Sequence, residues 1–215
     1  MLDIAVLSAF IPASLVIILS PGADTFLLLR FAIRFGRGAG FRAMIGILLG
    51  LSLLSLLLIS GVGLVVSQFP VALDVLTYLG IGILLFLTLT SVRAAIVLLQ
   101  ARSPRHTPGV SLTMSGSQRV TPLRMSLITN VTNPKVLIFY LAFFPQFLGE
   151  ATHVIGQLTL LSVVFLVVST AWLVPLVFVA SAARKFFQKP SVAVVMEFSV
   201  ATVFLALAVA LLFTL

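Results

Sequence analysis

Cysteine is absent from this 215-residue chain, and charged residues make up only 8% of it. Without thiols the chain cannot form disulfides, thiolate metal sites or thiol redox centres. Soluble domains carry about 25% charged residues, whereas 61% of this chain is hydrophobic. No soluble fold of this size could bury so much apolar surface, so we predict an integral membrane protein.

Acidic residues are also scarce, because five Asp and Glu stand against thirteen Lys and Arg, for a formal net charge of +8. A basic excess can indicate nucleic-acid binding, but this chain has no basic soluble domain that could bind it. The two histidines, His106 and His153, lie in separate loops and cannot form a metal site alone. We therefore expect no nucleic-acid partner, no metal and no cofactor.

Six apolar segments exceed the roughly 20 residues that a helix needs to cross the hydrocarbon core. Because backbone polar groups inside a bilayer must be satisfied within the segment, we predict an all-α fold of six transmembrane helices. The predicted spans are residues 4–34, 43–66, 75–99, 123–148, 154–182 and 191–214.

The distribution of basic residues predicts the orientation of these spans. Cytoplasmic loops are enriched in Lys and Arg. The second and fourth loops contain none and carry only Asp74 and Glu150, whereas the other three loops hold or adjoin every basic residue except Lys135. We therefore predict that the first, third and fifth loops face the cytoplasm and that both termini lie outside.

A segment rich in Ser, Thr, Pro, Gly and Arg, residues 100–122, is typical of a flexible linker. It divides a single transmembrane domain, residues 1–215, into two three-helix halves, 4–99 and 123–214. Since each half has an odd number of spans, the second half crosses the membrane in the opposite direction. We predict two inverted halves in which the first and fourth spans are equivalent.

These two equivalent spans are both interrupted by a proline close to a charge. The first contains Pro21, Gly22 and Asp24, and the second contains Pro134 followed by Lys135. Proline lacks a backbone donor and frees a carbonyl one turn earlier, and glycine gives the chain room to unwind. Paired breaks at corresponding positions of two halves indicate the binding site of a transporter.

The two charges lie deep in the membrane. Asp24 precedes Arg34 by ten residues and Lys135 follows Leu123 by twelve, which places them about 15 Å and about 18 Å from the cytoplasmic edge. The hydrocarbon layer is about 30 Å thick. A lone charge near its midplane costs at least about 2.5 kcal/mol, so we expect both side chains to face the bundle interior or water.

Further polar groups accompany the second break. Asn130 and Asn133 lie three residues apart on one helix face and can hydrogen-bond across the gap. A half-helix that starts after a break also points its positive dipole end at the site. Together these groups could bind a carboxylate and an ammonium group. The alternatives are a proline kink without a ligand, or a purely structural bridge between Asp24 and Lys135.

Five other positions carry weaker signals. We interpret Glu197 in the sixth span and Arg93 in the third as a structural pair, with a gate or a proton path as the alternative. Gly46 and Gly50 have the small-xxx-small spacing of close helix packing. Trp172 could line the pathway, pack internally or contact lipid.

Aromatic residues gather at the outer end of the fourth span, where Phe143, Phe144 and Phe147 surround Pro145. Aromatic side chains are enriched where transmembrane segments meet the membrane–water interface. We therefore interpret these residues as an interfacial belt.

Two motifs resemble those of a known family. The segments Ser20–Thr25 and Gly36–Gly40 with Gly46 and Gly50, and the segment Asn133–Val136 with Phe139 and Phe144–Phe147, resemble the signatures of the lysine exporter / homoserine–threonine resistance (LysE/RhtB) family. The chain departs from the family pattern at Ala23, where a second proline is usual, and at 201–206, which lacks glycines. The resemblance implies proton-driven export of amino acids or their derivatives across the bacterial inner membrane.

We therefore expect a secondary-active exporter of an amino acid or a related small zwitterion, working by proton antiport. Lys135 and nearby amides would hold the carboxylate, and Asp24 would attract the ammonium group and carry the proton. One acid and one base suit a neutral amino acid better than a dibasic one. The partners are then the amino acid, protons and the lipid bilayer, and a homo-oligomer stays open.

Three rival functions have less support in the sequence. The alternative of an exporter or channel for another solute or a cation is weakened because Asp24 is the one clear acid of the interior. An intramembrane enzyme is disfavoured for the same reason, since an aspartyl protease needs two carboxylates. A passive subunit of a larger complex would leave the paired breaks unexplained.

Overall fold

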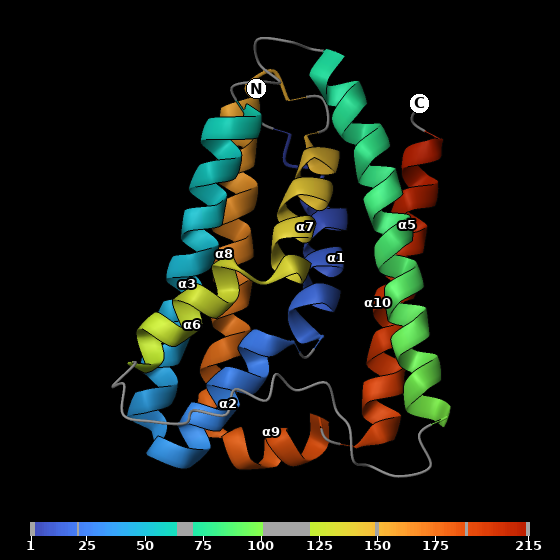
Figure 1. The fold of residues 1–215 in the computed structure, drawn as a ribbon. Coiled ribbons are helices and arrows are strands. Elements are labelled where there is room, and N and C mark those ends of the chain that lie inside the picture. Colours follow the sequence, from blue (N-terminus) through green and yellow to red (C-terminus); the bar gives the residue numbers. More distant parts are fainter. Residues whose placement is uncertain are drawn as a thin grey trace.

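A computed structural model of the protein describes residues 3–20, 22–63, 71–100, 121–148, 151–187 and 189–213. In this part of the chain all regular elements are helices (Figure 1), which confirms the predicted all-α class. Pro21, residues 101–120 of the predicted linker, and Glu150 lie outside the described residues.

The described helices follow one another along the chain. They are α1 (Leu7–Leu19), α2 (Ala23–Phe35), α3 (Arg37–Leu58), the π-helical η1 (Ile59–Gly63), α5 (Val71–Gln100), α6 (Pro122–Val131), α7 (Pro134–Phe143), the 3-10 helix η2 (Phe144–Phe147), α8 (Val154–Phe178), α9 (Ala180–Phe187) and α10 (Pro190–Leu212). The short α9 lies across one end of the bundle (Figure 1).

Three straight helical segments are long and apolar enough to cross a membrane, namely Arg37–Gly61, Tyr78–Gln100 and Val154–Phe178. Two bent pairs bring the number of candidate spans to five: α1 with α2, bent by 55°, and Pro122–Val131 with Lys135–Phe147, bent by 57°. The apolar part of α10, Ser191–Ala206, is shorter. The described structure therefore supports three to five spans, and the sixth stays a prediction.

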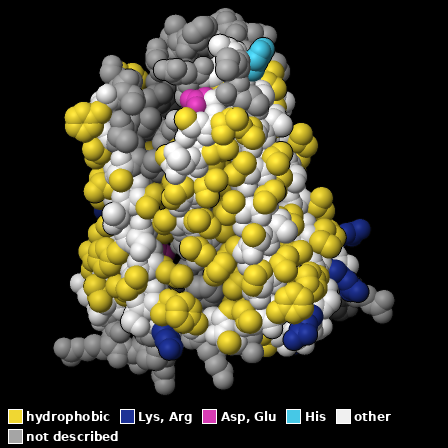
Figure 2. Space-filling view, turned by 180° about the vertical axis from the view of Figure 1, so that it is seen from behind, with side chains coloured by type: hydrophobic (Ala, Val, Ile, Leu, Met, Phe, Trp, Pro, Cys, Tyr) yellow, Lys and Arg dark blue, Asp and Glu magenta, His cyan; other side chains and the backbone are white. Residues whose placement is uncertain are grey.

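The outer surface between the two ends of the bundle is apolar. Large hydrophobic side chains such as Leu56, Leu89, Val167 and Phe198 are exposed. Figure 2 shows hydrophobic side chains over most of the visible face, with Lys and Arg mainly toward one end and His at the other. Soluble monomers rarely expose apolar patches of this extent, so the surface fits a lipid-embedded protein.

Buried side chains form two apolar clusters. The main cluster joins α1, α2, α3, α7 and α8, and includes Phe10, Leu28 and Leu158. The second lies between α5 and α10, which run side by side (Figure 1), and consists of Leu84, Leu87, Val200, Phe204 and Ala208. Val16 and Ile17 of α1 pack against this second cluster and so connect the α5–α10 pair to the rest of the bundle.

Glycines allow α2, α3 and α6 to approach one another. Gly36 has φ +82°, a conformation that L side chains rarely adopt, and forms the tight turn between α2 and α3. A Cβ on Gly46 would collide with the carbonyl oxygen of Leu123 in α6, and one on Gly50 would lie 2.5 Å from Oδ1 of Asn130. Both glycines that the sequence predicts as packing positions thus face α6.

We expect Gly46→Ala to destabilise the protein by about 1–3 kcal/mol, because the added methyl meets backbone that cannot rotate away. Gly82→Ala in α5 is the matched control, since the described structure leaves the space around its Cβ open to 4 Å. Thermal unfolding of both purified variants in detergent checks the prediction. Equal midpoints for the two variants would contradict it.

Candidate functional site

The two helix breaks meet in the interior of the bundle. The first lies between Leu19, the last residue of α1, and Ala23, the first of α2. The second lies between Val131 of α6 and Pro134 of α7. Side chains that lie more than 100 positions apart in the chain hydrogen-bond across them, so the breaks form one site.

Asp24 is held by two amides. It lies in the first turn of α2, where the helix dipole favours a negative charge. Its Oδ2 accepts hydrogen bonds from Nδ2 of Asn130 at 3.0 Å and from Nδ2 of Asn133 at 3.1 Å. Asn133 also caps α7, because its Oδ1 accepts a hydrogen bond from the backbone N–H of Lys135 at 3.1 Å. One side chain thus orients both the acid and the start of the half-helix.

Lys135 reaches across to the other break. Its Nζ donates a hydrogen bond to Oγ of Ser20 at 2.7 Å. Among the hydrogen bonds and ion pairs of the described residues, none joins Lys135 directly to Asp24. The acid and the base therefore border the same site through different partners, and an ammonium group has two further N–H donors to offer.

A pocket of about 90 Å³ opens between these groups. Because one water needs about 10–15 Å³ on this measure, the pocket has room for about six to nine water-sized groups, the size of a small or medium amino acid. Its lining comes from six helices: Ile17, Ile18, Ser20, Gly22, Asp24, Thr25, Ile47, Leu51, Asn130, Asn133, Lys135, Val136, Phe139, Phe165, Ser169, Trp172 and Leu173.

Several polar atoms of this lining are buried without a hydrogen-bond partner in the described structure. They are Oδ1 of Asp24, Oδ1 of Asn130, Oγ of Ser169 and Nε1 of Trp172. Buried polar groups in native proteins are nearly always paired. The set comprises two acceptors, one donor and one hydroxyl that can do either, which is what a small ligand with both donors and acceptors would satisfy.

Aromatic rings close one side of the pocket. Phe139 and Phe165 line it and lie 5.1 Å apart between ring centroids. They continue into a cluster in which Tyr140 stacks on Phe144 at 4.6 Å. The predicted interfacial belt is wrong, because Phe143 and Phe144 are fully buried and Phe147 is 7% exposed. These rings pack inward around Phe10 of α1.

The sequence predicts Asp24, Asn130, Asn133, Lys135 and Gly22 as site residues, and all five line the pocket. The sequence left Trp172 undecided and gave no signal for Ser169. A serine in an apolar helix usually bonds to its own backbone. Ser169 differs from such a serine because α8 packs beside the two breaks and places Ser169 in the pocket lining.

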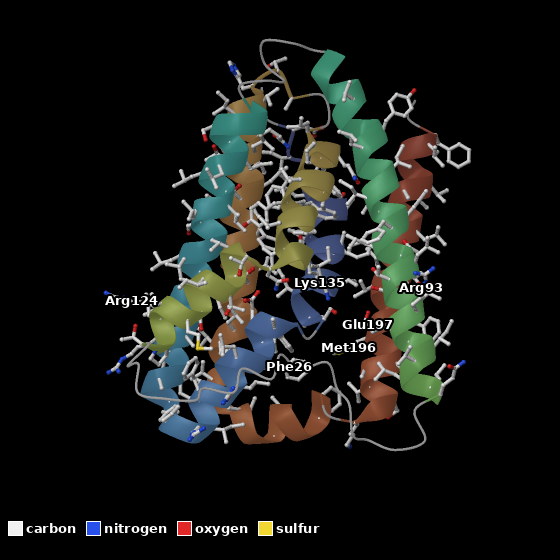
Figure 3. The ribbon with its side chains drawn as sticks, viewed as in Figure 1. Phe26, Arg93, Arg124, Lys135, Met196 and Glu197 are labelled. Carbon is white, nitrogen blue, oxygen red and sulfur yellow. The ribbon has the colours of Figure 1, made fainter. Side chains whose placement is uncertain are left out.

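The side chains of Glu197 and Arg93 do not face each other. Figure 3 shows Glu197 on the inner side of α10, toward Lys135, and Arg93 on the outer side of α5. Glu197 is half-buried and Arg93 exposed, and no ion pair between them is recorded in the described structure. Glu197 lies near enough to Lys135 for their opposite charges to attract each other.

Bent apolar helices around a polar pocket define the class of a membrane transport protein. The model of one family, the LysE type translocators, matches residues 15–214. The chain therefore belongs to the LysE type translocator family, which confirms the resemblance of the two motifs. It is a transporter rather than an enzyme.

Relatives support this assignment over most of the chain. An uncharacterized membrane protein of Bacillus subtilis, YrhP, is 25% identical over 182 residues, 85% of this chain and 86% of that protein. A leucine efflux protein of Klebsiella pneumoniae is 31% identical over 139 residues, 65% of this chain and 61% of that protein. One of Salmonella typhimurium is 27% identical over 169 residues, 76% and 74% of the two chains. No solved structure matches.

Proposed function

We propose that the protein exports a neutral amino acid with an apolar side chain, of which leucine is the model substrate. The observation that carries the proposal is that one acid, Asp24, and one base, Lys135, line the same pocket, whose other walls are largely apolar. The leucine efflux proteins among the relatives support the same substrate class.

The free atoms of the pocket suggest how the zwitterion binds. The ammonium group would donate to Oδ1 of Asp24 and Oδ1 of Asn130, which have no partner among the described residues. The carboxylate would accept from Nζ of Lys135 and Nε1 of Trp172. Both ends of the substrate would thereby gain charge-assisted hydrogen bonds, which are stronger than neutral ones.

The walls of the pocket suit an aliphatic side chain. Ile47, Leu51 and Val136 contribute branched apolar surface, and Phe139 with Phe165 contributes ring faces. Burying such a side chain is favourable by about 25 cal/mol per Å² of apolar area removed from water. A second cationic group would find no additional acid in the described lining, which disfavours lysine and arginine as substrates.

Six spans in two inverted halves remain the architecture that we propose. The ribbon supports it, because α1–α2, α3, α5, α6–α7, α8 and α10 run alternately down and up (Figure 1). Corresponding elements are also neighbours, since α5 packs on α10 and α3 on α8. We propose the bacterial inner membrane as the location, with both termini outside, because Lys and Arg gather at the end opposite the start of α1.

Proton antiport is the coupling that this site supports best. Asp24 would hold either the coupling proton or the substrate ammonium group, so that binding of one displaces the other. A cation channel has less support, because the described residues contain no group of three or more metal-binding side chains.

The test is transport by the purified protein in proteoliposomes. We expect vesicles preloaded with unlabelled leucine to accumulate labelled leucine by exchange, and vesicles preloaded with lysine to accumulate far less. A proton gradient imposed across leucine-loaded vesicles should drive net release. Exchange of lysine as fast as leucine, or of neither, would contradict the proposal.

A further inference from the structure

Glu197 occupies a position on the buried face of α10. Val200, Ala201 and Phe204 follow it by three, four and seven residues and are 1%, 4% and 1% exposed. Residues at these spacings share one face of a helix. Glu197 is also the one ionisable residue in the sequence of α10, and a carboxylate beside the buried face of an otherwise apolar helix is stabilised by a compensating charge.

Lys135 supplies that charge. The charges of Glu197 and Asp24 both attract its ammonium group. In Figure 3 the side chain of Glu197 lies on the side of α10 that faces Lys135. Asp24 is already bound through Oδ2 to two asparagines, whereas Arg93 is exposed and turned away from Glu197.

The attraction between Lys135 and Glu197 does not involve a direct ion pair in the described part of the chain. In this structure Nζ of Lys135 is hydrogen-bonded to Ser20, and no ion pair with Glu197 is recorded among the described residues. The two charges lie where the two apolar clusters meet, because Val192 and Met196 of α10 pack against the main cluster while Val200 and Phe204 belong to the second.

We propose that Glu197 is the counter-ion of Lys135 while the pocket is empty, and that the carboxylate of the substrate displaces it. The proposal rests on the amino-acid site proposed above and adds a competitor for its carboxylate position. Glu197 would keep Lys135 neutralised in a dry interior and would lower the affinity of the site for carboxylates. It acts through Lys135 and is a positioning residue.

Equilibrium binding of labelled leucine to the purified protein tests the proposal, with three unlabelled competitors. Leucine carries both charged groups, isocaproate lacks the ammonium group, and leucinamide lacks the carboxylate. In Glu197→Gln we expect the affinity for leucine and for isocaproate to rise about tenfold, because the competing charge is gone. The affinity for leucinamide should not change. Ser199→Ala, exposed on α10, is the control and should match the wild type.

Unchanged affinity for both carboxylates in Glu197→Gln would overturn the proposal, as would an equal change for leucinamide. If Glu197→Gln does not accumulate in the membrane, Glu197→Asp replaces it. Its shorter side chain withdraws the charge from Lys135 and should produce a smaller change in the same direction. Failure of the wild type to bind leucine at all would instead count against the proposed function.

Discussion

Asp24→Asn is expected to lower leucine exchange by about a hundredfold. The substitution keeps the size of the side chain and removes the charge that the substrate ammonium group would meet. Hydrogen bonds to charged groups contribute about 1.5–3 kcal/mol, and truncating one partner of a buried charged pair costs about 2–5 kcal/mol. The measurement is exchange of labelled leucine in proteoliposomes at equal protein content.

The same variant should also change what the site selects. Without the carboxylate at position 24, the affinities for isocaproate and leucine should become similar, because the ammonium group that isocaproate lacks no longer has a negative partner. Asp3→Asn is a suitable control, since Asp3 accepts a hydrogen bond from the backbone of Ala5, a role that the asparagine oxygen can take over. Undiminished exchange by Asp24→Asn would contradict the assignment of this acid.

Lys135→Met should lower leucine exchange by a similar factor. It should remove the preference for ligands with a carboxylate, whereas Asp24→Asn removes the preference for ligands with an ammonium group. Methionine fills the space of the lysine stem but cannot bind a carboxylate, so about a hundredfold loss in leucine exchange follows from the lost charged hydrogen bond. Leucinamide should then compete nearly as well as leucine. The measurement is the same exchange assay with leucinamide as competitor.

Lys189→Met, at an exposed position before α10, is the matched control for removal of a lysine and should keep wild-type exchange. A Lys135→Met variant that still discriminates against leucinamide would contradict the role of Lys135. The selectivity changes expected for Asp24→Asn and Lys135→Met do not depend on expression level. They therefore distinguish a role in substrate binding from a loss of folding.

The sequence predicts the site residues but not how they pair. Charge deep in an apolar span identified Asp24 and Lys135 because burial of a charge is costly wherever it occurs. Their partners lie 106 and 115 positions away, at Asn130 and Ser20. Such pairings depend on how the helices pack, and spacing within one segment carries no information about the register between two.

Glycine packing illustrates this limit. The spacing of Gly46 and Gly50 predicts a close helix contact but does not name the partner helix. In the structure that partner is α6, and the missing side chain of Gly50 leaves the space that Oδ1 of Asn130 occupies. A position predicted only for packing therefore also shapes the pocket.

For the aromatic residues at the end of the fourth predicted span, the sequence-based prediction is wrong. Phe143, Phe144 and Phe147 have the composition of an interfacial belt, yet they pack inward against Phe10. Composition at the end of a span does not distinguish a ring that meets lipid headgroups from one that meets another helix. The contact with α1 decides between the two, and it becomes visible only in three dimensions.

Saturable binding of labelled leucine to purified protein tests the central claim most directly, because it needs neither a gradient nor a particular orientation in the membrane. We predict one saturable site in the wild type and severe loss of binding in Asp24→Asn and in Lys135→Met, with folding confirmed by thermal unfolding. Wild-type affinity in both variants would contradict it.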